Sequence, residues 1–139
     1  MRAVVDTNIL VRAVLKPFGT VGPMVDRLEH AAYTPVYTGE LLAELTEVLD
    51  RPRIRERSAL TAAYRARTLA LIAEEGERVT VERRIVACRD LKDEMVLEAA
   101  VTGHADVIVT GDQDLLVLSP FEGIPIVGPA EFLAILGDP

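Results

Sequence analysis

Four acidic residues lie at positions that exposure to solvent does not explain: Asp6, Glu44, Asp93 and Asp112. Asp6 and Asp112 each follow a short apolar run, so each is expected where a buried strand ends. Carboxylates that gather in one pocket repel one another, and they stay ionised together only when a cation joins them. Oxygen ligands of this kind suit Mg²⁺ or Mn²⁺, which can activate water for hydrolysis. The pattern therefore predicts a site for a hard divalent cation.

Asp93 stands at the start of the apolar stripe of a predicted helix. Apolar residues follow it three, four and seven positions later, which places all of them on one helical face. Glu94 and Glu98 are then expected to point away from the core. Asp93 could instead only cap the helix, although Asp90 competes for that role. A charge buried at Asp93 is costly without a partner, so a core-facing Asp93 favours a metal site.

Glu44 borders the apolar stripe of an earlier predicted helix, whereas Glu40 and Glu47 lie on its far side as surface residues. Asp112 and Asp114 belong to a Gly-Asp-Gln-Asp turn, where aspartates are common for structural reasons alone. Each of these acids has an ordinary explanation when it is considered singly. Together, two strand ends and two helix faces indicate one cluster.

The elements that position these acids alternate between short apolar runs and amphipathic stretches. This alternation predicts one α/β domain over residues 1–139, with a parallel sheet covered by helices and the acids at its carboxyl edge. Strands are expected at 3–5, 35–37, 78–81, 105–112 and 124–127. Helices are expected from about residue 9, capped by Thr7 or Asn8, and at 21–32, 39–50, 59–75, 90–103, 115–118 and 129–136, with a basic connection at 51–58.

The composition is that of a globular protein, because half of the 139 residues are hydrophobic and 27% are charged. Cys88 is the only cysteine, which excludes an internal disulfide, and no apolar run approaches the roughly 18 residues that span a bilayer. An acid at position 6 is unlike a secretory leader, so we expect a cytoplasmic protein without a membrane partner. His30 and His104 lack metal-ligand spacing, which argues against zinc. The net charge of −7 opposes nucleic-acid binding unless the acids hold cations.

Four segments together resemble the PIN-domain nucleases, in particular the stand-alone VapC-like toxins of toxin–antitoxin pairs, over nearly the whole chain. They are Val4-Val5-Asp6-Thr7-Asn8, Leu42-Ala43-Glu44-Leu45, Cys88-Arg89-Asp90-Leu91-Lys92-Asp93 and Val109-Thr110-Gly111-Asp112-Gln113-Asp114-Leu115-Leu116. Each is weak alone, but the four in this order at these separations are specific. The resemblance implies a three-layer α/β/α domain with a central, mainly parallel sheet of about four or five strands.

The same resemblance implies an endoribonuclease that hydrolyses RNA phosphodiester bonds with one or two Mg²⁺ or Mn²⁺ ions. It assigns the catalytic metal ligands to Asp6, Glu44, Asp93 and Asp112, with Asp114 as an auxiliary ligand. An antitoxin protein and a second copy of the chain are the implied partners.

Further polar and basic residues complete the expected site. Thr7, Asn8 and Thr110 could orient ligands or waters beside the metal. The arginines that follow the helix of Glu44 could bind RNA phosphates: Arg51, Arg53, Arg55 and Arg57. A solvated helix face or a partner-protein surface explains these arginines equally well.

One stretch departs from the family pattern, and other functions fit the same pocket. Close relatives tend to read Asp-Pro-Lys-Asp-Asn where this chain has Asp90-Leu91-Lys92-Asp93-Glu94, so both aspartates are kept and a negative charge is added. A metal-dependent phosphatase or a DNA nuclease could use a similar acid cluster, although Asn8 counts against a haloacid-dehalogenase pattern. A non-catalytic acid-pocket module is a third possibility, but no lysine follows Lys92 as a receiver domain would require.

Overall fold

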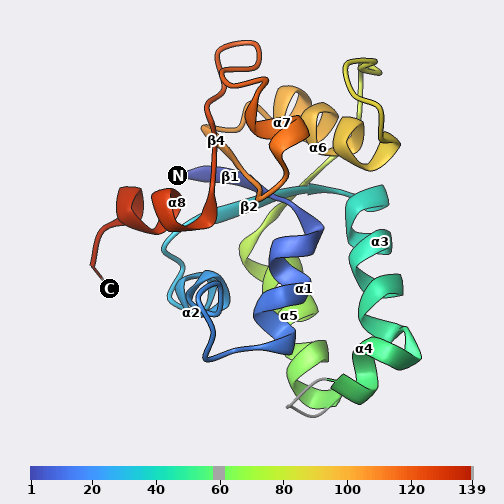
Figure 1. Cartoon of the computed structure of the whole chain (residues 1–139), viewed down its shortest axis with the longest axis vertical. Coiled ribbons are helices and arrows are strands. Elements are labelled where there is room, and N and C mark those ends of the chain that lie inside the picture. Colours follow the sequence, from blue (N-terminus) through green and yellow to red (C-terminus); the bar gives the residue numbers. More distant parts are fainter. Residues whose placement is uncertain (58–61, 139) are drawn as a thin grey trace.

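A parallel β-sheet forms the centre of the structure (Figure 1). The computed structural model describes residues 1–57 and 62–138. Its strands are β1 (Arg2–Val5), β2 (Thr34–Thr38), β3 (Glu77–Val79), β4 (Val107–Val109) and β5 (Ile126–Val127). They lie in the order β3-β2-β1-β4-β5, and each neighbouring pair is parallel. Because β1 and β4 are neighbours, the residues that follow these two strands meet at the carboxyl edge of the sheet.

Helices cover both faces of this sheet. In the described residues they are α1 (Thr7–Leu15), α2 (Pro23–Glu29), α3 (Gly39–Asp50), α4 (Pro52–Arg57), α5 (Ala62–Glu75), α6 (Leu91–Thr102), α7 (Gln113–Leu116) and α8 (Pro129–Leu136). Ala3 and Val5 of β1 pack against α1, α2, α5 and α8, whereas Val4 packs against α6 and α7 on the opposite face. The predicted three-layer α/β/α arrangement is therefore confirmed. None of the helices within 1–57 and 62–138 combines the length and apolar character needed to cross a bilayer.

Most predicted elements form within a few residues of their expected bounds. The C-terminal helix has the predicted bounds, 129–136, and Thr38 caps α3 by accepting a hydrogen bond from Leu41 N at 3.1 Å. The helix predicted for 21–32 is shorter, because Ala31 adopts a φ of 54° that an α-helix does not allow. Residues 59–61 of the helix predicted for 59–75 lie outside the described residues.

The prediction of a basic connection at residues 51–58 is wrong, because Pro52–Arg57 forms helix α4; Ser58 lies outside the described part. Proline fixes the φ angle that the first helical position requires, so Pro52 opens a new helix directly after α3. The backbone N–H groups of Ile54 and Arg55 both donate to the carbonyl of Arg51 at 3.0 Å. The arginines of this segment are therefore carried on a short helix.

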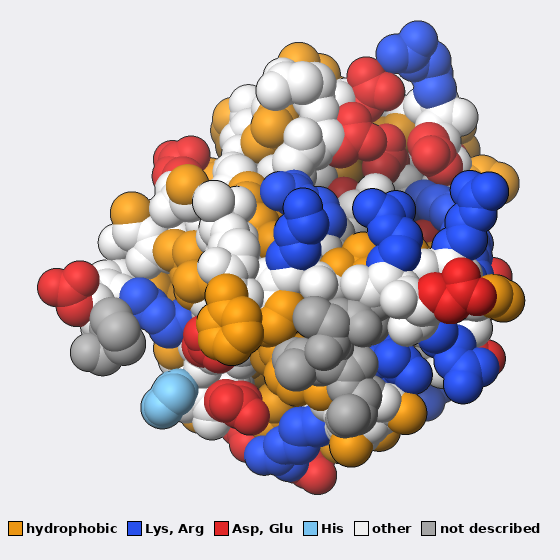
Figure 2. Space-filling model, turned by 60° about the horizontal axis from the view of Figure 1, so that its bottom comes forward, with side chains coloured by type: hydrophobic (Ala, Val, Ile, Leu, Met, Phe, Trp, Pro, Cys, Tyr) orange, Lys and Arg blue, Asp and Glu red, His pale blue; other side chains and the backbone are white. Residues whose placement is uncertain are grey.

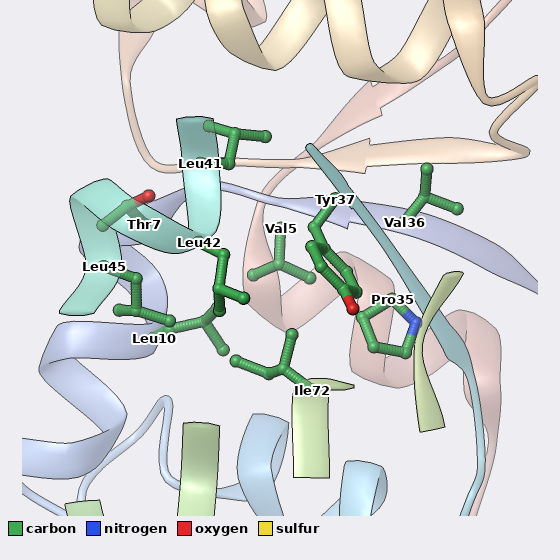
Figure 3. A pocket seen from close by; sticks show the side chains of 10 residues that line it. All are labelled: Val5, Thr7, Leu10, Pro35, Val36, Tyr37, Leu41, Leu42, Leu45 and Ile72. Carbon is green, nitrogen blue, oxygen red and sulfur yellow. The ribbon is translucent and has the colours of Figure 1, made fainter. Parts of the chain in front are cut away.

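A small gap lies inside the core between α1, α3, α5 and β2. Figure 3 shows Val5, Leu10, Leu42 and Ile72 directed into it, and its volume is about 30 Å³. A gap of this size holds no more than a water molecule or two, and its lining is mostly apolar. It is a packing defect rather than a ligand site.

Candidate metal centre

Asp6 is fixed where β1 ends, at the centre of the sheet. Its backbone N–H donates to the carbonyl of Val109 at 2.8 Å, which joins it to the end of β4. The Thr110 hydroxyl donates to Asp6 Oδ2 at 2.7 Å and accepts from the backbone N–H of Asp112 at 3.1 Å. Asp6 is 8% exposed and Thr110 is fully buried. One hydroxyl thus holds together the two aspartate-bearing strand ends.

Asp6 also caps α1, which corrects the prediction that Thr7 or Asn8 does so. Its Oδ1 accepts from the backbone N–H of Asn8 at 3.2 Å, while Thr7 already lies inside the helix and is buried. The N-terminus of a helix attracts negative charge, so an acidic side chain suits this capping position.

The carboxylates of Asp93, Asp112 and Asp114 form the tightest acid cluster in the described residues. One oxygen from each lies within 4.8 Å of the other two. Asp112 caps α7 by accepting from the N–H of Asp114 at 2.9 Å, and this turn holds both side chains. Asp93 projects from the first turn of α6 and is 6% exposed, as its place on the apolar stripe predicts. The alternative that Asp93 only caps the helix is wrong, because Asp90 is the cap.

The environment of Asp93 disfavours its negative charge. Burial, followed by the charges of Asp112, Asp6 and Asp90, raises the pKa of Asp93 from 3.8 to about 6. A hydrogen bond with Asp112 adds to this effect. A divalent cation among these oxygens would offset the repulsion, and hard carboxylate donors are the ligands that Mg²⁺ and Mn²⁺ prefer. The donor set and its electrostatics therefore fit such an ion.

Two cations lie against the outer acids. Arg89 Nη2 lies 3.2 Å from Asp114 Oδ1, and Lys92 Nζ lies 3.4 Å from Glu44 Oε1. The Glu44 side chain is 16% exposed, in agreement with its predicted place at the border of the core. Glu44 is not part of the 4.8 Å cluster. The structure thus brings together Asp93, Asp112 and Asp114, places Asp6 close enough to Asp93 to affect its pKa, and pairs Glu44 with Lys92.

A hollow of about 310 Å³ opens beside Asp6 and Asp112. Asn8 and Arg12 of α1 line it, together with Gly111. A Cβ atom at Gly111 would lie 4.0 Å from Arg12 Nη1, so this guanidinium lies against the turn that carries Asp112. Arg12 was not among the predicted site residues, although its place one helical turn after Asn8 indicates that it lies on the same helical face.

The prediction that Glu94 and Glu98 point away from the core is wrong, because both side chains are buried. They are 7% and 4% exposed. The N–H of Ala87 donates to Glu94 Oε2 and the N–H of Ile85 donates to Glu98 Oε2, each at 2.9 Å. Apolar residues occur all around α6, a pattern typical of a helix buried on several sides, and this was the signal for their burial. The two glutamates therefore hold the irregular segment that leads into the acid cluster.

A sequence model of the PIN domain family matches residues 2–114, from the first strand to the last acid of the cluster. The chain belongs to the PIN-domain family. No curated protein matches the chain. PIN domains are generally metal-dependent nucleases, and the carboxylates of Asp93, Asp112 and Asp114 form a group that can hold a metal ion.

Proposed function

We propose that this PIN domain is an endoribonuclease that hydrolyses RNA phosphodiester bonds with Mg²⁺ or Mn²⁺. The observation that carries the proposal is the group of carboxylate oxygens from Asp93, Asp112 and Asp114, which lie within 4.8 Å of one another. The family match over residues 2–114 supports nuclease chemistry at this group.

The acids have distinct parts in this proposal. Asp93, Asp112 and Asp114 hold the metal, and Asp6 faces the same region from the end of β1. Glu44 completes the acid set from α3. A bound divalent cation supplies Lewis-acid stabilisation of phosphoryl oxygens and lowers the pKa of water.

Neighbouring residues position these acids and the substrate. Thr110 fixes Asp6 through a hydrogen bond of 2.7 Å, and the backbone N–H of Asn8 donates to Asp6 at 3.2 Å. Thr7, which is buried in the first turn of α1, is the third positioning residue of the proposal. Arg12 offers its guanidinium to a phosphate in the hollow beside Asp112. Hydrolysis adds water to phosphorus and breaks the bond to the leaving sugar oxygen, which leaves a phosphate monoester and a hydroxyl.

The arginines after α3 form a less uniform group than the sequence predicts. Arg51 donates to both carboxylate oxygens of Glu47, at 3.0 and 2.9 Å, and Arg55 lies 3.9 Å from Asp50. Arg53 and Arg57 have no such ion pair among the described residues, so they are the two members of the group that we propose to bind phosphate.

The cellular role in the proposal is that of a cytoplasmic toxin held by an antitoxin protein, with a homodimer as its working form. Only the VapC-like sequence resemblance supports this part. Purification of the chain together with the product of a neighbouring gene, followed by inhibition of cleavage by that product, tests it.

The substrate test is incubation of the protein with Mn²⁺ and three substrates: single-stranded RNA, single-stranded DNA and a chromogenic phosphate monoester. We expect cleavage within the RNA chain, and we expect EDTA to abolish it. Preferential DNA cleavage or hydrolysis of the monoester alone would replace the proposal with a DNA nuclease or a phosphatase. Absence of all three activities, with Mn²⁺ still bound, would favour a non-catalytic acid pocket.

A further inference from the structure

A second hollow, of about 460 Å³, lies farther along α1 and has basic walls. Arg12 and Lys16 line it from the side of α1, and Arg57 lines it from the end of α4. Residues 19–21 close it from the loop that follows α1. None of these residues belongs to the acid cluster.

The two hollows share a wall. Arg12 lines both of them, and Asn8, Arg12 and Lys16 are spaced by four residues, so they lie along one face of the helical segment. The distance from Asn8 to Lys16 along the helix axis is about 12 Å. Figure 2 shows Lys and Arg side chains gathered on the face below a group of acidic side chains. Arg12 therefore connects the hollow beside Asp112 to the basic hollow.

The cations of this hollow are available to a ligand. Among ion pairs of the described residues, none involves Arg12, Lys16 or Arg57, and all three are exposed. Three unpaired cations on a chain of net charge −7 form a local basic site, and guanidinium and ammonium groups bind phosphate.

An exposed aromatic side chain lies in the loop that borders this hollow. Phe18 is 98% exposed and lies in the loop between Lys16 and Gly19, both of which line the hollow. A ring with this exposure contributes no stabilisation by burial in the core of its own molecule. Unpaired nucleic-acid bases stack on aromatic rings of this kind beside a basic groove.

We propose that the hollow formed by Arg12, Lys16 and Arg57 is a second phosphate subsite, which binds the RNA strand without metal. It holds a phosphate of the strand whose scissile bond lies at the acid cluster, and Phe18 stacks on the adjacent unpaired base. The subsite rests on the proposed function, since it assumes a polynucleotide substrate. A separation of about 12 Å can be spanned by a few nucleotides of one strand.

The binding test uses fluorescein-labelled single-stranded RNA of about three and about 12 nucleotides, with EDTA present so that binding is measured without cleavage. We expect the wild type to bind the longer RNA much more tightly. A Lys16→Ala/Arg57→Ala double variant should lose about tenfold or more in affinity for it, and the slope of log affinity against log salt should fall by about 1.4. Phe18→Ala should lose about tenfold with little change of slope. The matched control is Arg83→Ala, whose guanidinium pairs with Glu122 outside the hollow.

The outcomes separate the subsite from the proposed function. Unchanged affinity and salt slope in the double variant, with wild-type thermal melting, would overturn the subsite even if Mn²⁺-dependent RNA cleavage is observed. Equal loss in Arg83→Ala would also overturn it, because the effect would then come from overall charge. Wild-type cleavage of DNA alone would overturn the proposed function, while the EDTA binding measurements would still decide the subsite.

Discussion

Replacement of Asp93 by asparagine removes one charge from a buried acid cluster, and we expect it to stabilise the metal-free protein. The pKa of Asp93 rises from 3.8 to about 6, so the folded state holds its proton more tightly than the unfolded state does. A shift of about two units corresponds to up to about 3 kcal/mol. Asp93 is 6% exposed, so solvent screens little of this free energy.

The sign of the pH dependence follows from proton binding. Between pH 3.8 and about 6 the folded state binds more protons at Asp93, so the free energy of unfolding falls as pH rises through this window. Above about pH 6 the full free-energy cost of the buried Asp93 charge is present. The excess in free energy of unfolding of Asp93→Asn over the wild type should therefore be largest near pH 8, about 3 kcal/mol at most. It should shrink as pH approaches 4.

Urea unfolding in EDTA, monitored by circular dichroism near pH 8 and again near pH 4.5, measures this difference. Asp26→Asn, an exposed acid on α2, is the matched control and should change stability by less than about 0.5 kcal/mol. Saturating Mn²⁺ should reverse the order, because at about 1,000 times its dissociation constant the ion adds about 4.1 kcal/mol to the wild type alone. An Asp93→Asn variant that is less stable than the wild type near pH 8 in EDTA would refute the reasoning.

Three further variants test the groups around the cluster. Arg89→Ala removes the cation beside Asp114 and should raise Mn²⁺ affinity about twofold in a calorimetric titration; lower affinity would show that Arg89 does not compete with the metal. Thr110→Val removes the hydroxyl that fixes Asp6 and should cost about 10- to 100-fold in Mn²⁺ affinity, with melting as the check on folding. Glu98→Ala leaves a buried backbone N–H unpaired and should lower the free energy of unfolding by about 1–3 kcal/mol, whereas no loss on urea denaturation would contradict its anchoring part.

The sheet and the strand-end acids could be predicted from local pattern. Runs such as Val107–Val109 are too apolar for an exposed strand, and a polar residue directly after them marks the carboxyl edge. Alternation of strands and helices then predicts a parallel sheet with both acids at its carboxyl edge, but the strand order that makes β1 and β4 neighbours comes from the structure.

The parts that could not be predicted depend on contacts between distant segments. Glu94 and Glu98 are buried because the segment at 85–87 folds over α6. Apolar residues all around α6 indicate burial on several sides, but they do not identify the segment that covers the helix. Glu44 has the expected burial, but its partner Lys92 lies on another helix. Arg12 is a candidate because its guanidinium lies against Gly111, which belongs to a segment distant in sequence.

Cleavage of single-stranded RNA in Mn²⁺ by the wild type and by Asp112→Asn tests the central claim, that the acid edge is the nuclease centre. Asn at this position keeps the size and the capping oxygen of Asp112 but removes its charge. We expect Mn²⁺-dependent cleavage by the wild type and a loss of at least about 100-fold in the variant, with thermal melting in EDTA preserved. Wild-type cleavage rates in Asp112→Asn would contradict the claim.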